Sequence, residues 1–278
     1  RADLVQHLDE SLREEILPLV AKAEREDIRK LVSYEEGTAG AIMSTDYAVL
    51  RQEMCVLQAI EQLRMQAPGK ETIYYVYVVD EARKLIGFVS LKDLIVAKSS
   101  QTVRDIMHTD IIQGKVSDDQ EVIAKLIEKY DLIAIPIVDD KQILVGIVTH
   151  DDAMDIIRQE QTEDMEKFMG ITGSHEVGDY LKVSSWDHFT KRIYWVVALA
   201  VLGLFSGMII HSFESTLTSL LILALYMPML ADTGGNTGSQ SASVVVRALA
   251  LGQLRPRDFL RVIYKELKIS MGIAVVLG

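Results

Sequence analysis

The spacing of apolar residues divides the chain into three kinds of segment. Within residues 1–36, apolar positions recur at three- and four-residue steps, which predicts two short amphipathic helices at the end of a helical N-terminal domain. From 37 to 165, helical patterns alternate with apolar and β-branched runs that are typical of strands. Beyond residue 190 the chain consists mainly of long apolar runs with few charges. The pattern predicts a multidomain protein with a helical piece, an α/β part and an α-helical membrane part.

Residues 37–165 contain an internal repeat, with one copy at 37–100 and the next at 101–165. Each copy has a helical pattern, two predicted strands joined by a charged turn, and a closing helix. The segments 79–87 and 138–146 align without a gap. Because a small α/β unit buries its apolar face by packing against another, we expect the two copies to pair.

The closing motifs of the two copies are Gly-Phe-Val-Ser-Leu-Lys-Asp at 87–93 and Gly-Ile-Val-Thr-His-Asp-Asp at 146–152. They resemble a tandem pair of CBS domains, in which a hydroxyl and an Asp three residues later hold the ribose of an adenine nucleotide. The resemblance implies nucleotide contacts at Tyr75, Ser90, Asp93, Thr149 and Asp152, with Tyr75 stacking on the base. The same Ser/Thr-x-x-Asp spacing is also a helix-capping signature, and both roles can hold at once.

Carboxylates are concentrated between residues 149 and 164. On a helix, Asp152 and Asp155 are neighbours, and Glu160 lies beside Glu163 and Asp164. Like charges at these spacings repel unless something neutralises them, and hard cations such as Mg²⁺ take oxygen ligands. A solvated acidic helix is the alternative interpretation.

The segment 166–190 predicts a connecting helix near a membrane surface, with Trp186 as an interfacial aromatic residue. The run 193–210 has 18 residues without a charge, which is enough for one membrane crossing. A second segment over about 216–246 and the start of a third at Ile269 follow. Lys and Arg flank the first crossing on its N-terminal side and follow the second. This places 1–190 on the cytoplasmic side of a multi-pass protein of the inner or plasma membrane.

The second membrane segment contains a polar block at 228–240, with three glycines, one carboxylate and two amides. Lipid cannot hydrogen-bond such groups, so the block faces protein or a water-filled path. We expect a bend or local unwinding at Gly234-Gly235 that exposes backbone carbonyls. A tight helix–helix contact through small residues is the alternative.

Composition narrows the possible functions. The net charge is −11, with a balance of −15 in residues 1–190 and +4 in 191–278. An acidic front half argues against nucleic-acid binding. The single cysteine, Cys55, rules out an internal disulfide framework. The scattered histidines form no metal or nucleophile motif, so we do not expect an enzyme.

Met-Pro-Met-Leu at 227–230 and Gly-Gly-Asn-Thr-Gly-Ser-Gln-Ser-Ala at 234–242 resemble the second membrane helix of the MgtE-type magnesium transporter family. The order of domains and Thr-Glu-Asp at 162–164 also fit. The resemblance implies a homodimer in the lipid bilayer that forms a Mg²⁺-selective channel, closed by cytosolic Mg²⁺, with ATP as a further ligand of the CBS pair. The implied Mg²⁺ ligands are Asp119, Glu121, Asp131, Asp152, Asp155, Glu160, Glu163 and Asp164. The implied pore residues are Asp232, Gly234, Gly235, Asn236 and Gln240.

In that family the main ion-selecting aspartate lies in a later helix, so we expect this chain to be a piece that does not conduct alone. Two alternatives remain at this point. One is a transporter of another ion, a different divalent cation or an anion, regulated by an adenine nucleotide at the CBS pair. The other is a soluble nucleotide-sensing module of an enzyme, which the uncharged run 193–210 disfavours.

Overall fold

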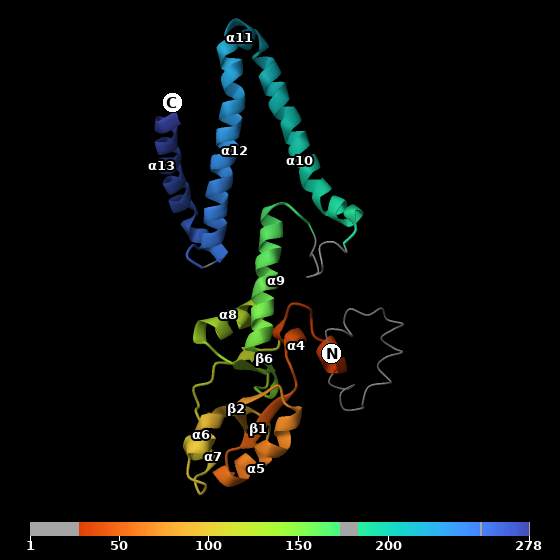
Figure 1. Ribbon diagram of the computed structural model, residues 1–278, viewed down its shortest axis with the longest axis vertical. Coiled ribbons are helices and arrows are strands. Elements are labelled where there is room, and N and C mark those ends of the chain that lie inside the picture. Colours follow the sequence, from red (N-terminus) through yellow and green to blue (C-terminus); the bar gives the residue numbers. More distant parts are fainter. Residues whose placement is uncertain (1–27, 173–182, 251, 278) are drawn as a thin grey trace. The chain divides into compact units, whose positions relative to one another are not determined.

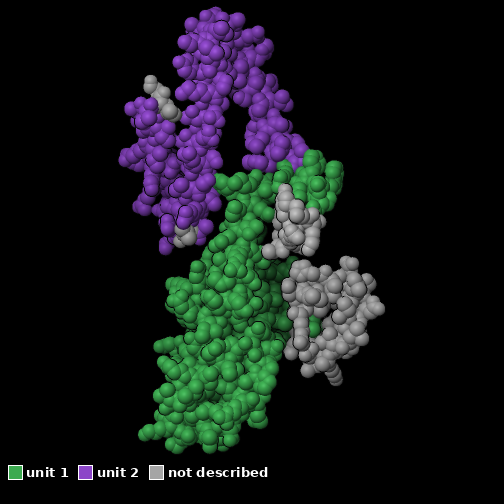
Figure 2. Space-filling model, viewed as in Figure 1, with its two compact units in different colours: residues 1–192 green, residues 193–278 purple. Residues whose placement is uncertain are grey.

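The computed structural model describes residues 28–172, 183–250 and 252–277 (Figure 1). These fall into two units with their boundary between Arg192 and Ile193, shown in different colours in Figure 2. The first of the two predicted N-terminal helices lies outside the described residues. The second is helical over 28–32.

The first unit contains two copies of a small α/β unit, which confirms the predicted tandem CBS fold. In the first copy, strands β1 (Tyr47–Arg51), β2 (Thr72–Val79) and β3 (Leu85–Ser90) form a sheet in that order, with β1 parallel and β3 antiparallel to β2. The second copy repeats this with β4 (Gly114–Lys115), β5 (Ala134–Val138) and β6 (Leu144–Thr149).

Helices cover these sheets. The first copy has α5 (Val56–Gln66), the 3₁₀ turn η2 (Ala67–Gly69) and α6 (Leu91–Val96), and the second has α8 (Gln120–Tyr130) and α9 (His150–Phe168). Two short helices, α4 (Ala39–Ile42) and α7 (Val103–Ile106), lead into the copies. Every residue of β5 and β6 is buried, which explains why these strands read as continuous apolar runs rather than as an alternating pattern.

The lead-in of each copy packs into the other copy. Met43, just ahead of β1, belongs to the buried cluster of the second copy, where Gly146 faces it, while Met107 packs on Gly87 in the first copy. Backbone bridges accompany both contacts: Ser44 pairs with Ile147, and Phe88 pairs with His108. The glycines are required by this close approach, because a Cβ on Gly146 would lie 2.5 Å from the Met43 sulfur.

The second unit is helical. The helix α10 (Ser185–Ser212) runs into it from the first unit, and α11 (Glu214–Ser219), α12 (Leu221–Ala250) and α13 (Phe259–Leu277) follow, with a 3₁₀ turn η3 (Pro256–Asp258) before α13. Among the described residues, α10 is the one helix long and apolar enough to cross a membrane by length and composition, with a mean hydropathy of 2.3 over its apolar window.

The expected unwinding at Gly234-Gly235 is wrong, because α12 is helical from Leu221 to Ala250 through both glycines and Pro228. A glycine weakens a helix by about 1 kcal/mol without forbidding it. In an apolar surrounding, an unwound turn would leave several backbone groups without partners, which costs more than the glycines do. The third helix also begins earlier than predicted, at Phe259 instead of Ile269.

Because Met43 of the first copy packs against Gly146 of the second, we predict that Gly146→Ala destabilises the first unit. The added methyl group would overlap the buried Met43 side chain down to its Cβ, so we expect a loss of about 1–3 kcal/mol, the usual cost of overpacking. Thermal unfolding of the purified chain measures it. Gly69→Ala is the matched control, since a Cβ there meets no atom within 4 Å. Equal melting temperatures for the two variants would contradict the packing constraint.

Candidate cation and nucleotide sites

The carboxylates predicted to bind Mg²⁺ lie on or beside α8 and α9, which pack against each other (Figure 1). Near the start of α8, Gln120 Nε2 donates a 2.8 Å hydrogen bond to Oε1 of Glu160 in the middle of α9. Beyond the other end of α8, the amide of His150, at the start of α9, donates to the Ile133 carbonyl at 2.9 Å. The predicted ligands therefore divide into two groups, one at each end of α8.

The first group surrounds the N-terminal end of α8. Asp119 caps this helix by accepting from the Glu121 amide at 2.7 Å, and Glu121 pairs with Lys125 at 2.6 Å. From α9 the group receives Glu160, and one turn further on Glu163 and Asp164. Glu163 pairs with Lys167 at 2.6 Å, and this hydrogen bond raises the pKa of the Lys167 ammonium.

The second group lies at the C-terminal end of α8. Asp131 ends the helix in a left-handed conformation with φ 50°. The Asp152 carboxylate accepts a 2.7 Å hydrogen bond from the Thr149 hydroxyl in the first turn of α9. Asp155 pairs with Arg158 at 3.1 Å, and both side chains are more than three-quarters exposed.

Across residues 28–172, 183–250 and 252–277, no three or more acidic, His or Cys side chains converge as a ready-made metal site. Each group instead presents two or more exposed carboxylates on neighbouring helices, some neutralised by Lys or Arg. Such a surface can bind a hydrated Mg²⁺ through one or two oxygens, or complete its shell with carboxylates from another surface. Sequence reasoning did not identify Gln120, whose amide joins the two helices. An amide carries no charge signal that would have singled it out.

In the first nucleotide motif, Ser90 and Asp93 already form hydrogen bonds with each other. The Ser90 hydroxyl and amide donate to Asp93 Oδ2 at 2.6 and 3.2 Å, and the Asp93 amide donates to the Ser90 hydroxyl oxygen, which forms the capping box of α6. His108 Nε2 lies 3.1 Å from the same carboxylate oxygen. Burial raises the pKa of the Asp93 carboxyl, but the hydrogen bonds from Ser90 and His108 outweigh it and hold the pKa below its ordinary value.

An aromatic row lies beside this motif. The Tyr75 ring meets Phe88 edge-on with a centroid separation of 5.5 Å, and Phe88 stacks on His108 at 5.1 Å. His108 was not predicted from the sequence, because it belongs to the second copy and reaches the first only because the lead-in of the second copy packs there. In the second motif, Thr149 and Asp152 are joined by their side chains, while Thr149 makes no capping bond through its side chain.

The predicted pore residues all lie on the unbroken helix α12. Asp232, Asn236 and Gln240 recur every four residues, so they form a polar stripe about 12 Å long on one face. The residues Gly234 and Gly235 are open, with nothing within 4 Å of an added Cβ. Ser241, about half a turn round from Asp232, donates a 2.6 Å hydrogen bond to Glu266 of α13. The stripe therefore faces away from the contact with α13.

Family models match two parts of the chain. The MgtE family, described as a divalent cation transporter, matches residues 227–278, and the CBS domain matches 39–100 and 103–159. Curated relatives include the magnesium transporter MgtE of Thermus thermophilus, 41% identical over 91% of this chain and 55% of that protein. The protein of the same name from Bacillus subtilis is 36% identical over the same shares. The chain thus spans about half the length of these relatives.

Solved structures agree with this assignment. The soluble part of a magnesium transporter is 42% identical, with a TM-score of 0.56 over 57% of this chain and 62% of that one. The cytosolic domain of the Mg²⁺ channel MgtE in complex with ATP is 39% identical, with a TM-score of 0.55 over 56% of this chain and 64% of that one.

The hydrogen bonds to Asp93 predict a pH dependence of stability. A folded-state pKa below the ordinary 3.8 means that the ionised carboxylate stabilises the fold above pH 3.8, and that this contribution is lost as the pH falls through the folded-state pKa. The difference in unfolding free energy between the wild type and Asp93→Asn should therefore be largest near neutral pH and shrink on acidification. Urea unfolding over a pH series measures it, and Asp110→Asn, which removes an exposed carboxylate from the same region, is the control. A difference that stays constant with pH would contradict the prediction.

Proposed function

The chain belongs to the MgtE family, and from that membership we propose that it is a subunit of a Mg²⁺-selective channel closed by Mg²⁺ on its cytoplasmic side. The observation that carries the regulatory part of the proposal is the division of the carboxylates into two exposed groups at the ends of α8. The curated relatives named magnesium transporters support Mg²⁺ as the transported ion. The channel would serve magnesium uptake and homeostasis, and it is not an enzyme.

Gating follows from electrostatics. Without Mg²⁺, carboxylates within each group repel one another and any acidic surface brought near them. Mg²⁺ ions between such surfaces replace repulsion with shared ligands, so a compact arrangement of the acidic domain gains stability as Mg²⁺ rises. The ion shifts the population only by as much as it prefers this closed arrangement. In this proposal, the segment 166–190 between the domain and the membrane part transmits the change.

The membrane part supplies the conduit. We propose a homodimer, because the stripe of Asp232, Asn236 and Gln240 faces away from α13 and needs a polar surface opposite it. The flanking Lys and Arg residues favour a multi-pass arrangement in the cell membrane with residues 1–190 in the cytoplasm. Asn236, together with Asp232 and the open backbone at Gly234 and Gly235, would line the path as a supporting part of the pore.

We also propose that ATP binds at the first CBS motif. Asp93 is held ionised beside Ser90, and the aromatic row that begins at Tyr75 offers a face for the adenine ring. The related cytosolic domain in complex with ATP supports this assignment. The contacts from Ser90 and His108 all use Oδ2 of Asp93, so the ribose hydroxyls would share this carboxylate with them.

Removing carboxylates from both groups should weaken the response to Mg²⁺. We expect the variant Asp152→Asn, Asp155→Asn and Glu163→Gln to need about tenfold more Mg²⁺ than the wild type for protection of residues 150–190 from protease, since each lost ligand oxygen weakens a hard-cation site. Limited proteolysis of the chain in detergent over a Mg²⁺ series measures the midpoint.

The control for this prediction is Glu61→Gln, Glu81→Gln and Asp140→Asn, which removes the same charge from exposed positions remote from α8 and α9. Its midpoint should match that of the wild type. Ca²⁺ at equal concentration tests whether the response is specific to Mg²⁺. Unchanged Mg²⁺ protection in the triple variant at 152, 155 and 163 would refute the site assignment.

Asp93→Asn should weaken ATP binding by about tenfold or more, because a hydrogen bond to a carboxylate is worth about 1.5–3 kcal/mol. Isothermal titration of the chain with ATP measures the affinity. Asp152→Asn alters the equivalent carboxylate of the second motif and shows whether one or both motifs bind. If ATP binds both variants as tightly as the wild type, the nucleotide assignment is wrong.

A further inference from the structure

A hollow of about 500 Å³ lies in the first unit, apart from both sites described above. Among the residues that the structure describes, its lining includes three basic side chains, Lys30, Lys70 and Arg83, and no Asp or Glu. None of the predicted Mg²⁺ ligands and none of the CBS-motif residues lines it. The chain has a net charge of −11, whereas the described charged side chains around this cavity are all positive.

The three basic residues come from separate parts of the chain. Lys30 lies on the helical segment 28–32, Lys70 directly follows η2, and Arg83 is in the turn between β2 and β3. Arg83 has φ 62°, a left-handed conformation that costs a non-glycine residue some strain. Gln142 takes the same conformation in the equivalent turn of the second copy, so the backbone there is a property of the repeat. The basic side chain is specific to the first copy.

The positive charges are poorly compensated. The Lys70 side chain is only 24% exposed, and its nearest carboxylate, on Asp46, is 3.9 Å away and 62% exposed. Lys30 and Arg83 are exposed, and within the described part of the chain they make no ion pair. Three like charges around one hollow repel one another, and the partly buried Lys70 ammonium lacks a close partner, which is costly. An anion between them would remove both penalties.

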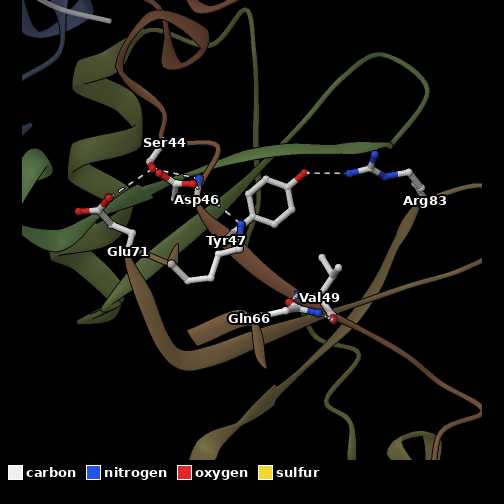
Figure 3. A network of polar contacts seen from close by, with 8 residues as sticks. Ser44, Asp46, Tyr47, Val49, Gln66, Glu71 and Arg83 are labelled. Atoms are coloured by element: carbon white, nitrogen blue, oxygen red, sulfur yellow. Dashed lines mark hydrogen bonds and ion pairs between the residues drawn. The ribbon is translucent and has the colours of Figure 1, made fainter. Parts of the chain in front are cut away.

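The walls of the hollow are held in place by hydrogen bonds, several of which Figure 3 shows. Arg83 Nη2 donates to the Tyr47 hydroxyl oxygen at 3.4 Å, and that hydroxyl donates to the Leu144 carbonyl at 3.0 Å. The Gln66 side chain spans the backbone of Val49, accepting from its amide at 3.2 Å and donating to its carbonyl at 3.3 Å. The cavity is therefore largely preformed, which lowers the entropic cost of binding.

The remaining lining indicates the kind of ligand. Thr45 and Tyr47 add hydroxyl-bearing side chains, while Ile143, Leu144 and Val145 form an apolar wall. We propose that this hollow binds a small phosphate-bearing molecule, with the phosphoryl oxygens among Lys30, Lys70 and Arg83 and the rest of the molecule against the apolar wall. Lys and Arg are the side chains that phosphate binding most often uses, and the volume is that of a small-molecule pocket.

Isothermal titration of the full chain in detergent with inorganic pyrophosphate, in EDTA and at low salt, tests the proposal. We expect binding that weakens by about tenfold or more in each of Lys70→Gln and Arg83→Asn, since hydrogen bonds between charged groups are about twice as strong as neutral ones. Asparagine is chosen at position 83 because it tolerates the left-handed backbone. Circular dichroism verifies that both variants remain folded.

Two controls make the result specific. Lys98→Gln removes one positive charge from an exposed site outside the hollow, and Asp93→Asn alters the CBS motif; neither should change pyrophosphate affinity. An absence of binding at millimolar pyrophosphate, an equal loss in Lys98→Gln, or a loss in Asp93→Asn would each overturn the proposal. Tighter binding of citrate than of pyrophosphate would overturn the phosphate assignment. Because Mg²⁺ is absent throughout, failure here leaves the proposed gating function untouched.

Discussion

The close approach of a methionine to a glycine, made once in each direction, is the constraint on which the first unit depends. Met43 needs the space above Gly146, and Met107 needs the space above Gly87. Neither copy completes its core with its own lead-in, so the two copies must fold together. The chain that follows each methionine is positioned by the same contact. After Met43 it carries Tyr47 to the basic hollow, and after Met107 it carries His108 to Asp93.

This rigid pair separates the charged groups of the unit into distinct places. The carboxylates gather at the two ends of α8, where they face solvent, while the basic residues Lys70 and Arg83 surround a hollow beside the first sheet. The packed core holds these opposite charges apart, and physiological salt screens the attraction between them, so they do not neutralise each other. Each surface thus keeps its own sign, as the proposed cation sites at α8 and α9 and the proposed anion site at the hollow require.

The strands and the repeat could be predicted because they follow from local periodicity and from a pattern that occurs twice, and the tandem CBS fold could be predicted because the motifs at 87–93 and 146–152 resemble that family. The packing of each lead-in against the other copy could not be predicted, since sequence spacing does not tell which copy a short segment packs against. His108 and Gln120 were missed for the same reason: their partners, Asp93 and Glu160, become neighbours only in the folded unit. The error at Gly234-Gly235 arose because the prediction gave more weight to the low helix propensity of glycine than to backbone hydrogen bonding. In an apolar surrounding the backbone must satisfy all its hydrogen bonds internally, which favours the helix.

That unbroken helix changes how the polar block in the membrane part should be understood. An unwound segment would offer backbone carbonyls, whereas a helix uses its carbonyls internally and offers side chains. Asp232, Asn236 and Gln240 then form the polar surface, and the open glycines beside them let another backbone or a hydrated ion come close. A carboxylate and two amides facing lipid would be costly, whereas the apolar side chains of α10 suit it. The stripe therefore requires protein or water opposite it, and the same stripe on a second copy meets that requirement.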